Sequence, residues 1–158
     1  MGNTLVAYFS VGGTTQSVAE KLAKAAGADL FEIKPKKMYT RDDIDYNTPK
    51  SRSSMEMADI TCRPEIMFKC RNMDDYDLVF VGFPIWWYRE PSIIDTFMEA
   101  YDFTGKAVVP FITSRGSDLG KAPENMQKLA PGAKVKTGRR FDRSVSESEL
   151  EMWAAAYR

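Results

Sequence analysis

The sequence predicts an α/β fold, a three-layer doubly wound sandwich with a five-stranded parallel sheet of order 2-1-3-4-5. Short apolar runs alternate with amphipathic helical patterns, an order that forces parallel strands with right-handed crossovers. Loops of unusual chemistry follow the first, third and fourth runs, where such a sheet binds its ligands. With 158 residues, 44% of them hydrophobic, the chain can bury one core. We therefore expect a single domain over 1–158.

Four apolar runs have the composition of buried strands. They are continuous and rich in β-branched or aromatic residues, as strands covered on both faces should be. These runs are Thr4–Phe9, Leu30–Ile33, Leu78–Phe83 and Ala107–Ile112. A weaker fifth strand is predicted at Ala133–Lys136 and could extend toward Phe141.

Helical patterns separate the predicted strands. The first begins at Thr14 and ends at Gly27, and three more begin at Pro64, Pro91 and Pro123. The final helix has the signature of a capping box, in which a serine is followed three residues later by a glutamate: Ser146 and Glu149.

The pattern that begins at Pro64 places Ile66, Met67, Cys70 and Met73 on one helical face. Cys70 is therefore expected in the core and not in a reactive site.

The polar segment from about 35 to 62 is too long for a simple connection between a strand and a helix. It could include a short helix near Arg52–Ala58. Insertions of this length usually serve a site or a partner, or remain mobile.

The composition excludes several classes of function. Lysine and arginine number 22 and so do aspartate and glutamate, so no global field selects nucleic acid or an anionic membrane. The chain has no histidine, which excludes Ser-His and Cys-His nucleophiles and histidine-ligated zinc. We expect a cytoplasmic protein because neither a signal peptide nor a membrane-spanning run is visible. One basic cluster, interpreted as a solvated edge, comprises Lys134, Lys136, Arg139, Arg140 and Arg143.

The loop after the first strand has the composition of a phosphate-binding nest. Two glycines, Gly12 and Gly13, let the backbone turn its N–H groups inward at the start of a helix. Ser10, Thr14 and Thr15 add hydroxyl donors. Because no lysine is present and no G-x-G-x-x-G spacing occurs, a phosphate monoester fits better than a nucleoside triphosphate or a dinucleotide. The alternative is a helix cap after a glycine turn.

The loop after the third strand carries consecutive aromatic side chains, which cannot all enter one core. Exposed aromatic rings suit a flat heteroaromatic ligand, or alternatively a protein interface. The segment is Pro84, Ile85, Trp86, Trp87 and Tyr88.

The loop after the fourth strand holds small polar residues that could hydrogen-bond the edge of a ring: Thr113, Ser114, Arg115 and Gly116. An ordinary strand-to-helix loop would have a similar composition. Arg115 adds a cation to this loop.

These segments together resemble the flavodoxin-like family, closest to its short single-domain bacterial branch. The resemblance rests on Tyr8-Phe9-Ser10 with Gly13 and Thr15, on Gly82–Trp87, on Tyr101–Lys106, on Thr113–Ser114 with Gly116–Ser117 and on Leu129–Ala133. It implies FMN, with its phosphate on the first loop and its isoalloxazine between the second and third. Gly12 departs from the family, which commonly has threonine there. Arg115 stands where glycine is usual, and beside the flavin its cation could stabilise the reduced, negatively charged ring, or it could point into solvent.

Three functions follow from this resemblance. The first is an FMN-binding electron carrier, a flavodoxin, that shuttles electrons between redox partner proteins as a monomer or weak homodimer. The alternative is an FMN-dependent NAD(P)H:quinone-type reductase, which needs a cavity above the flavin. A non-redox module that has lost the flavin is disfavoured, because the aromatic segment and the hydroxyl-rich loop are intact.

Overall fold

The computed structural model describes residues 3–158 and contains one parallel sheet of order β2-β1-β3-β4-β5, as predicted. A sixth short strand, β6, also pairs with β4 and prolongs the edge of the sheet. The strands are β1 (Asn3–Tyr8), β2 (Asp29–Glu32), β3 (Tyr76–Pro84), β4 (Ala107–Thr113), β5 (Lys134–Val135) and β6 (Arg139–Phe141).

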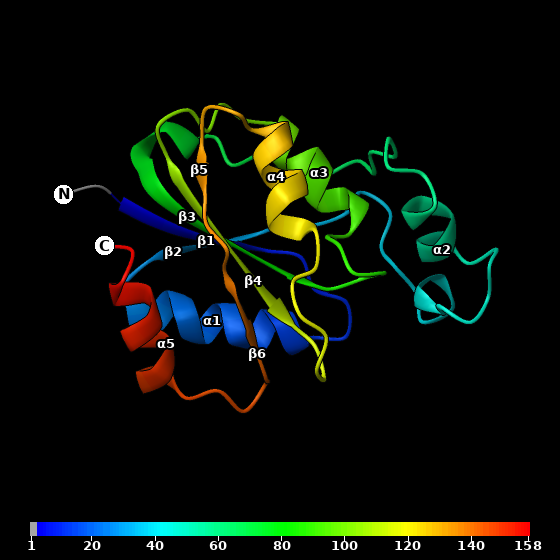
Figure 1. Ribbon diagram of the computed structural model, residues 1–158, viewed down its shortest axis with the longest axis horizontal. Coiled ribbons are helices and arrows are strands. Elements are labelled where there is room, and N and C mark those ends of the chain that lie inside the picture. Colours follow the sequence, from blue (N-terminus) through cyan, green and yellow to red (C-terminus); the bar gives the residue numbers. More distant parts are fainter. Residues whose placement is uncertain (1–2) are drawn as a thin grey trace.

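Helices cover both faces of the sheet and form the expected three layers (Figure 1). One face carries α1 (Thr14–Ala26) and α5 (Glu147–Ala155), and the other carries α3 (Ser92–Glu99) and α4 (Ala122–Leu129). A short helix, α2 (Arg52–Met57), lies beyond the carboxyl ends of the strands. Two single 3₁₀ turns occur at Asp42–Ile44 and Met73–Asp75.

Alternate side chains of each strand supply the two cores. In β1, Leu5 and Ala7 are buried under α3 and α4, whereas Val6 and Tyr8 are buried under α1 and α5. This alternation follows from the two-residue period of a strand, and it explains why the strands are apolar without interruption.

The predicted end of the first helix at Gly27 and the predicted start of the last helix at Ser146 are confirmed. Gly27 ends α1 in the left-handed conformation with a φ of 62°, and the next N–H, of Ala28, bonds to the carbonyl of Ala23. The Ser146 hydroxyl accepts a hydrogen bond from the Glu149 N–H at 3.1 Å and caps α5.

The helix predicted from Pro64 is wrong. The segment is extended, and Ile66 forms an antiparallel bridge with Pro35, supported by a 2.7 Å bond from the Met67 N–H to the Lys34 carbonyl. A short isolated helix is marginal, so a backbone partner in another part of the chain outcompetes it. Cys70 is nevertheless buried as expected.

The fifth strand does reach Phe141, but it is interrupted opposite Pro110 of β4. Proline has no N–H to donate to a ladder, and the neighbouring edge strand turns away at Gly138, whose φ is 75°. A Cβ at Gly138 would lie 2.0 Å from the Pro110 carbonyl oxygen, so only glycine fits. The interruption divides the predicted strand into β5 and β6.

The long connection at 35–62 is ordered around Arg52, at the start of the predicted short helix. The guanidinium donates to Glu56 at 3.0 Å and to the Lys37 carbonyl at 2.8 Å. It also lies 3.7 Å from the centre of the Tyr39 ring, a cation–π distance. Arg52 thereby ties α2 to the start of the connection.

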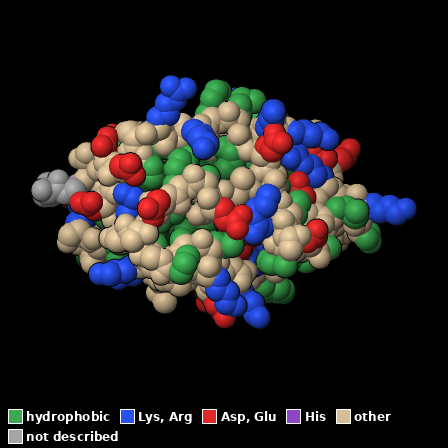
Figure 2. Space-filling view, turned by 90° about the horizontal axis from the view of Figure 1, so that it is seen from above, with side chains coloured by type: hydrophobic (Ala, Val, Ile, Leu, Met, Phe, Trp, Pro, Cys, Tyr) green, Lys and Arg blue, Asp and Glu red, His purple; other side chains and the backbone are tan. Residues whose placement is uncertain are grey.

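Positive and negative side chains are interspersed over the face that α3 and α4 cover, as the balanced composition predicts (Figure 2). Within the basic cluster, Arg139 pairs with Glu149 at 2.9 Å and Arg140 with Asp142 at 2.8 Å. Within residues 3–158, every helix is too short or too polar to cross a membrane.

Candidate functional site

Two cavities lie along the carboxyl edge of the sheet. The first has a volume of about 380 Å³ and is lined by polar loop residues, including Thr14, Thr15, Thr113, Ser114 and Arg115. The second, about 360 Å³, is lined mainly by the aromatic segment Ile85, Trp86, Trp87 and Tyr88. The fold therefore brings the three loops singled out in the sequence to one edge, as a doubly wound sheet requires.

The first loop has the geometry of a nest at a helix start. Gly12 and Gly13 have φ values of 87° and 94°, the left-handed region that glycine tolerates. A Cβ built on either glycine meets nothing within 4 Å, so the loop borders open space. The Ser10 hydroxyl accepts the Gln16 N–H at 3.1 Å and keeps its own proton for another partner.

Thr15, in the first turn of α1, and Thr113, the last residue of β4, hydrogen-bond each other. Their hydroxyl oxygens lie 2.6 Å apart, and both residues are buried. This contact fixes the first loop to the end of β4. It also gives a protein partner to the Thr15 hydroxyl, which the sequence placed among the donors to a ligand. Thr15 and the half-buried Thr14 both line the cavity.

The aromatic loop closes as a tight turn over 86–89. Trp86 and Arg89 exchange two backbone hydrogen bonds, each of 3.1 Å, around the central residues Trp87 and Tyr88. Those residues have φ values of 48° and 63°, the type I′ geometry that normally selects asparagine and glycine. An aromatic residue in this region costs about 1–3 kcal/mol, a strain that clusters at functional sites.

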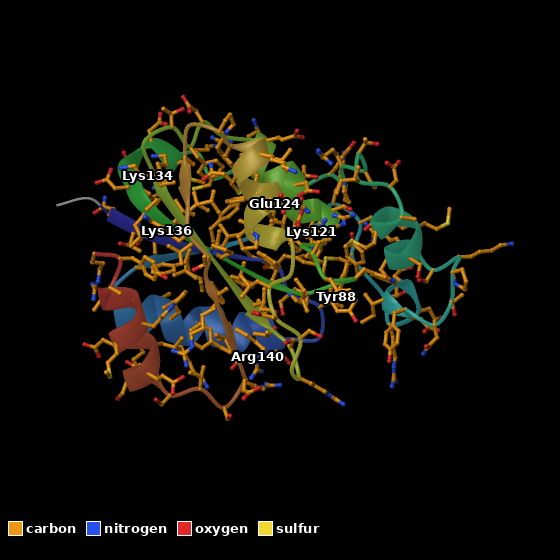
Figure 3. The ribbon with its side chains drawn as sticks, viewed as in Figure 1. Tyr88, Lys121, Glu124, Lys134, Lys136 and Arg140 are labelled. Atoms are coloured by element: carbon orange, nitrogen blue, oxygen red, sulfur yellow. The ribbon has the colours of Figure 1, made fainter. Side chains whose placement is uncertain are left out.

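Gly120 holds Tyr88 in this strained turn. The Lys121 N–H donates to the Tyr88 carbonyl at 2.9 Å, and Figure 3 shows Tyr88 beside this end of α4. A Cβ on Gly120 would lie 2.0 Å from the Tyr88 carbonyl oxygen. The loop before α4 therefore approaches the turn as closely as only glycine allows.

The two tryptophans have different surroundings. Trp86 packs edge-on against Phe9 and Tyr39, with ring centres 5.7 and 5.6 Å apart, so it belongs partly to the core. Trp87 is 44% exposed and its ring is available to a ligand. Ile44 and Tyr46 of the long connection complete the aromatic cavity, a contribution that the sequence did not reveal.

Tyr39 links the aromatic wall to α2. Its hydroxyl donates to the Glu56 carboxylate, and burial together with this bond raises the pKa of the phenol. Tyr39 therefore stays neutral, and the Arg52–Tyr39–Glu56 contact anchors the long connection against Trp86.

The charge around the polar cavity favours an anion. Arg115 and Arg143 both line it, whereas the lining acid Asp142 is paired with Arg140. Sequence reasoning placed Arg143 on a solvated edge and missed this role. Its position just after the last strand was the available signal, because all parallel strands end at the same edge.

A family model described as flavodoxin matches residues 3–157. The chain belongs to the flavodoxin family. A search of curated proteins found no match.

Solved structures of the flavodoxin type agree with the fold. Described as candidate flavoproteins, proteins from Bacteroides eggerthii and Bacteroides uniformis are 44% and 42% identical, with TM-scores of 0.92 and 0.91. The match to the Bacteroides eggerthii protein covers 99% of this chain and 98% of that one. The match to the Bacteroides uniformis protein covers 98% of each chain. A flavoprotein in complex with FMN from Lactobacillus acidophilus is 24% identical, with a TM-score of 0.74 over 98% of this chain and 99% of that one.

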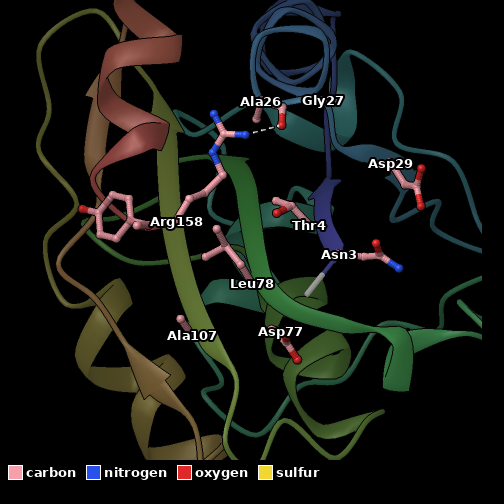
Figure 4. Close-up of a pocket in the computed structure, with 10 residues that line it drawn as sticks. Asn3, Thr4, Ala26, Gly27, Asp29, Asp77, Leu78, Ala107 and Arg158 are labelled. Carbon is pink, nitrogen blue, oxygen red and sulfur yellow. Dashed lines mark hydrogen bonds between the residues drawn. The ribbon is translucent and has the colours of Figure 1, made fainter. Parts of the chain in front are cut away.

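A larger cavity, about 520 Å³, lies at the opposite end of the sheet (Figure 4). It is lined by the amino ends of strands and by Arg158, whose guanidinium donates to the Ala26 carbonyl at 2.9 Å. A flavodoxin sheet places its ligand at the carboxyl ends, so this cavity is not the candidate site.

Proposed function

We propose that the protein binds one FMN non-covalently and carries electrons between redox partner proteins. The observation that carries this proposal is the adjacency of two cavities at one sheet edge, one polar and cationic and one aromatic. A phosphate and a flat heteroaromatic ring are the two ends of FMN. That the Lactobacillus acidophilus neighbour is a complex with FMN supports the same ligand here.

The first loop would hold the phosphate. The start of α1 offers N–H groups that have no partner within the helix, together with the positive end of the helix dipole. Thr14 and the cations Arg115 and Arg143 line the polar cavity beside this helix start. The Ser10 hydroxyl, in the same loop, keeps a proton that it could donate. Neutral donors reinforced by two exposed cations suit a single terminal phosphate.

The turn at 86–89 would hold the isoalloxazine. Trp87 and Tyr88 supply exposed rings, and Tyr46 lines the same cavity. The loop after β4 lies between the two cavities, because Ser114 and Arg115 line one and Ser117 the other. FMN supplies, when bound, a centre that accepts and releases electrons. The side chains of the chain orient it and limit its contact with water.

The phosphate assignment predicts a preference for FMN over riboflavin. We expect FMN to bind at least about 100-fold more tightly, equal to about 2.7 kcal/mol, because one or two charge-assisted hydrogen bonds contribute that much. Calorimetric titration of the flavin-free protein with each ligand measures the difference. Equal affinity for the two flavins would remove the phosphate site from the proposal.

The stacking assignment predicts that Trp87→Ala weakens FMN binding by about 1–3 kcal/mol, the usual contribution of base–aromatic stacking. Since Trp87 is 44% exposed, the free energy of unfolding should change little. Fluorescence titration and urea denaturation test the two statements.

Trp87→Phe is the matched control for stacking and should retain most of the affinity. Trp86→Ala should instead lower stability, because Trp86 packs against Phe9 and Tyr39. If Trp87→Ala left FMN affinity and flavin quenching unchanged, the exposed aromatic residues would serve a protein interface.

A further inference from the structure

A buried acidic pair lies directly behind the aromatic turn. Glu90 follows the turn and is 0% exposed, and Asp95, on α3, is 1% exposed. The two carboxyl groups lie close together, because an oxygen of each is within 4 Å of the same nitrogen, Arg89 Nη1. Carboxylates are rarely buried without compensating charge, so this arrangement requires a physical explanation.

One arginine supplies most of that compensation. The Arg89 guanidinium lies 3.7 Å from Glu90 Oε2 and 3.5 Å from Asp95 Oδ2, and its side chain is 11% exposed. Arg63, from the connection before β3, lies 3.8 Å from Asp95 but bonds Glu99 of α3 at 2.6 Å. Arg89 is therefore the main cation beside the two buried carboxyl groups, since Arg63 is paired with Glu99. If both carboxyls were ionised, the cluster would lack one positive charge.

Hydrogen bonding points to the same deficit. Asn125 of α4 donates to Glu90 Oε1 at 3.2 Å. Glu90 Oε2 and Asp95 Oδ1 are buried and find no hydrogen-bond donor among residues 3–158. A proton held by the pair supplies both the missing charge and a missing donor.

Arg89 connects this pair to the turn. Its backbone N–H and carbonyl close the 86–89 turn against Trp86, while its side chain donates to the carbonyls of Glu90 and Met57, each at 3.1 Å. Met57 is the last residue of α2, so the same guanidinium fastens the long connection. Arg89 thus connects the turn that carries Trp87 and Tyr88 to the acidic pair and to α2.

We propose that Glu90 and Asp95 share one proton in the folded protein, and that this proton is a positioning element for the 86–89 turn. Loss of the proton leaves an uncompensated negative charge beside Arg89 and loosens the turn. The effect on FMN affinity rests on the proposed function, whereas the shared proton and its effect on the turn do not.

Electrostatics agrees with the geometry. Burial, with the neighbouring Asp95 as a further cause, raises the pKa of Glu90 to about 9, and burial also raises the pKa of Asp95. The charged groups that face the pair are Arg89, Arg63, Glu99 and, across a cavity of about 110 Å³, Lys128 of α4. The pair should therefore release its proton in mildly alkaline solution.

Carboxyl-detected ¹³C NMR of the labelled full chain tests the shared proton directly. We expect one glutamate signal, absent in Glu90→Gln, to titrate near pH 9. Titration of Glu90 in the ordinary carboxylate range would overturn the proposal, whether or not the protein binds flavin. If Glu90→Gln does not fold, Asp95→Asn identifies the signal of the other carboxyl group of the pair, and its loss should shift the titration of Glu90.

The effect on the turn is tested by FMN affinity between pH 7 and pH 10. For the native protein we expect the Kd to rise about tenfold, because pH 10 lies one unit above the pKa. Glu90→Gln, whose amide replaces the shared proton at every pH, should lose this rise. Glu151→Gln, an exposed glutamate on α5 on the other face of the sheet, is the matched control and should keep it.

Identical pH profiles in the native protein and Glu90→Gln would overturn the link between proton and turn. If no flavin binds at any pH, the proposed function fails while this inference is still tested, by tryptophan emission of the flavin-free protein. A pH-dependent change in emission that Glu90→Gln abolishes and Glu151→Gln retains supports it. The absence of such a change overturns it.

Discussion

Replacing Arg89 by methionine should lower the free energy of unfolding by about 4 kcal/mol at pH 7. Arg89 is the cation that compensates the buried pair of Glu90 and Asp95, and removing one partner of a buried ion pair costs about 3–5 kcal/mol. Protonation of Asp95 limits this cost. Keeping a carboxyl protonated at pH 7 costs about 1.4 kcal/mol for each pH unit above its unfolded pKa of about 3.9.

The same argument fixes the sign of the pH dependence. Loss of Arg89 raises the folded pKa of Asp95 further, so the penalty is present above the unfolded pKa and disappears as the pH falls toward it. The expected penalty is therefore about 1.5 kcal/mol at pH 5. Urea denaturation of the native protein and the variant at pH 5, 6 and 7 measures it.

Arg139→Met is the matched control. Arg139 forms an exposed ion pair with Glu149 at 2.9 Å, and surface pairs contribute at most about 1 kcal/mol. A penalty for Arg89→Met that is equally small, or that does not change with pH, would show that Arg89 does not compensate buried charge.

Replacing Gly120 by alanine should destabilise the fold by about 2–4 kcal/mol and displace the 86–89 turn. The added Cβ would lie 2.0 Å from the Tyr88 carbonyl oxygen, and backbone cannot rotate away as a side chain can. The bond from the Lys121 N–H to that carbonyl would be lost. Under the proposed function, FMN affinity should fall at least about tenfold.

Gly27→Ala separates the clash from backbone strain. Gly27 and Gly120 have similar φ values, 62° and 55°, but a Cβ on Gly27 meets nothing within 4 Å. Gly27→Ala should therefore cost only about 1–2 kcal/mol, the penalty of the left-handed conformation alone. Urea denaturation compares the two variants, and equal losses of stability would show that the contact with Tyr88 is unimportant.

The positions of the main strands and helices could be predicted because their signals are local. Buried strands are recognisable from continuous apolar runs such as Leu78–Phe83, and helix ends from residues such as Gly27 and Ser146. The meeting of the candidate loops at one edge could also be predicted, since parallel strands all end at the same edge of a sheet. Thr15, Trp87 and Thr113 could therefore be singled out before the fold was known.

The segment after Pro64 shows where local patterns fail. Apolar residues spaced by three and four fit a helix. They also fit the extended chain that the structure has, in which Cys70 is buried in the core and Ile66 packs partly buried against it. Ile66 pairs with Pro35, and no local pattern encodes that partner. The division of the last strand at Gly138 has the same origin, because the missing donor belongs to Pro110 on another strand.

The sequence alone determined the topology, the flavodoxin resemblance and the loops that form the candidate site, because periodicity, turn residues and loop composition act over a few neighbours. Only the tertiary structure decided which polar groups meet: Thr15 with Thr113, Arg52 with Tyr39, and Arg89 with Glu90 and Asp95. The physical reason is that buried polar groups must find partners wherever the packed backbone brings them. That requirement depends on distances between segments far apart in the chain.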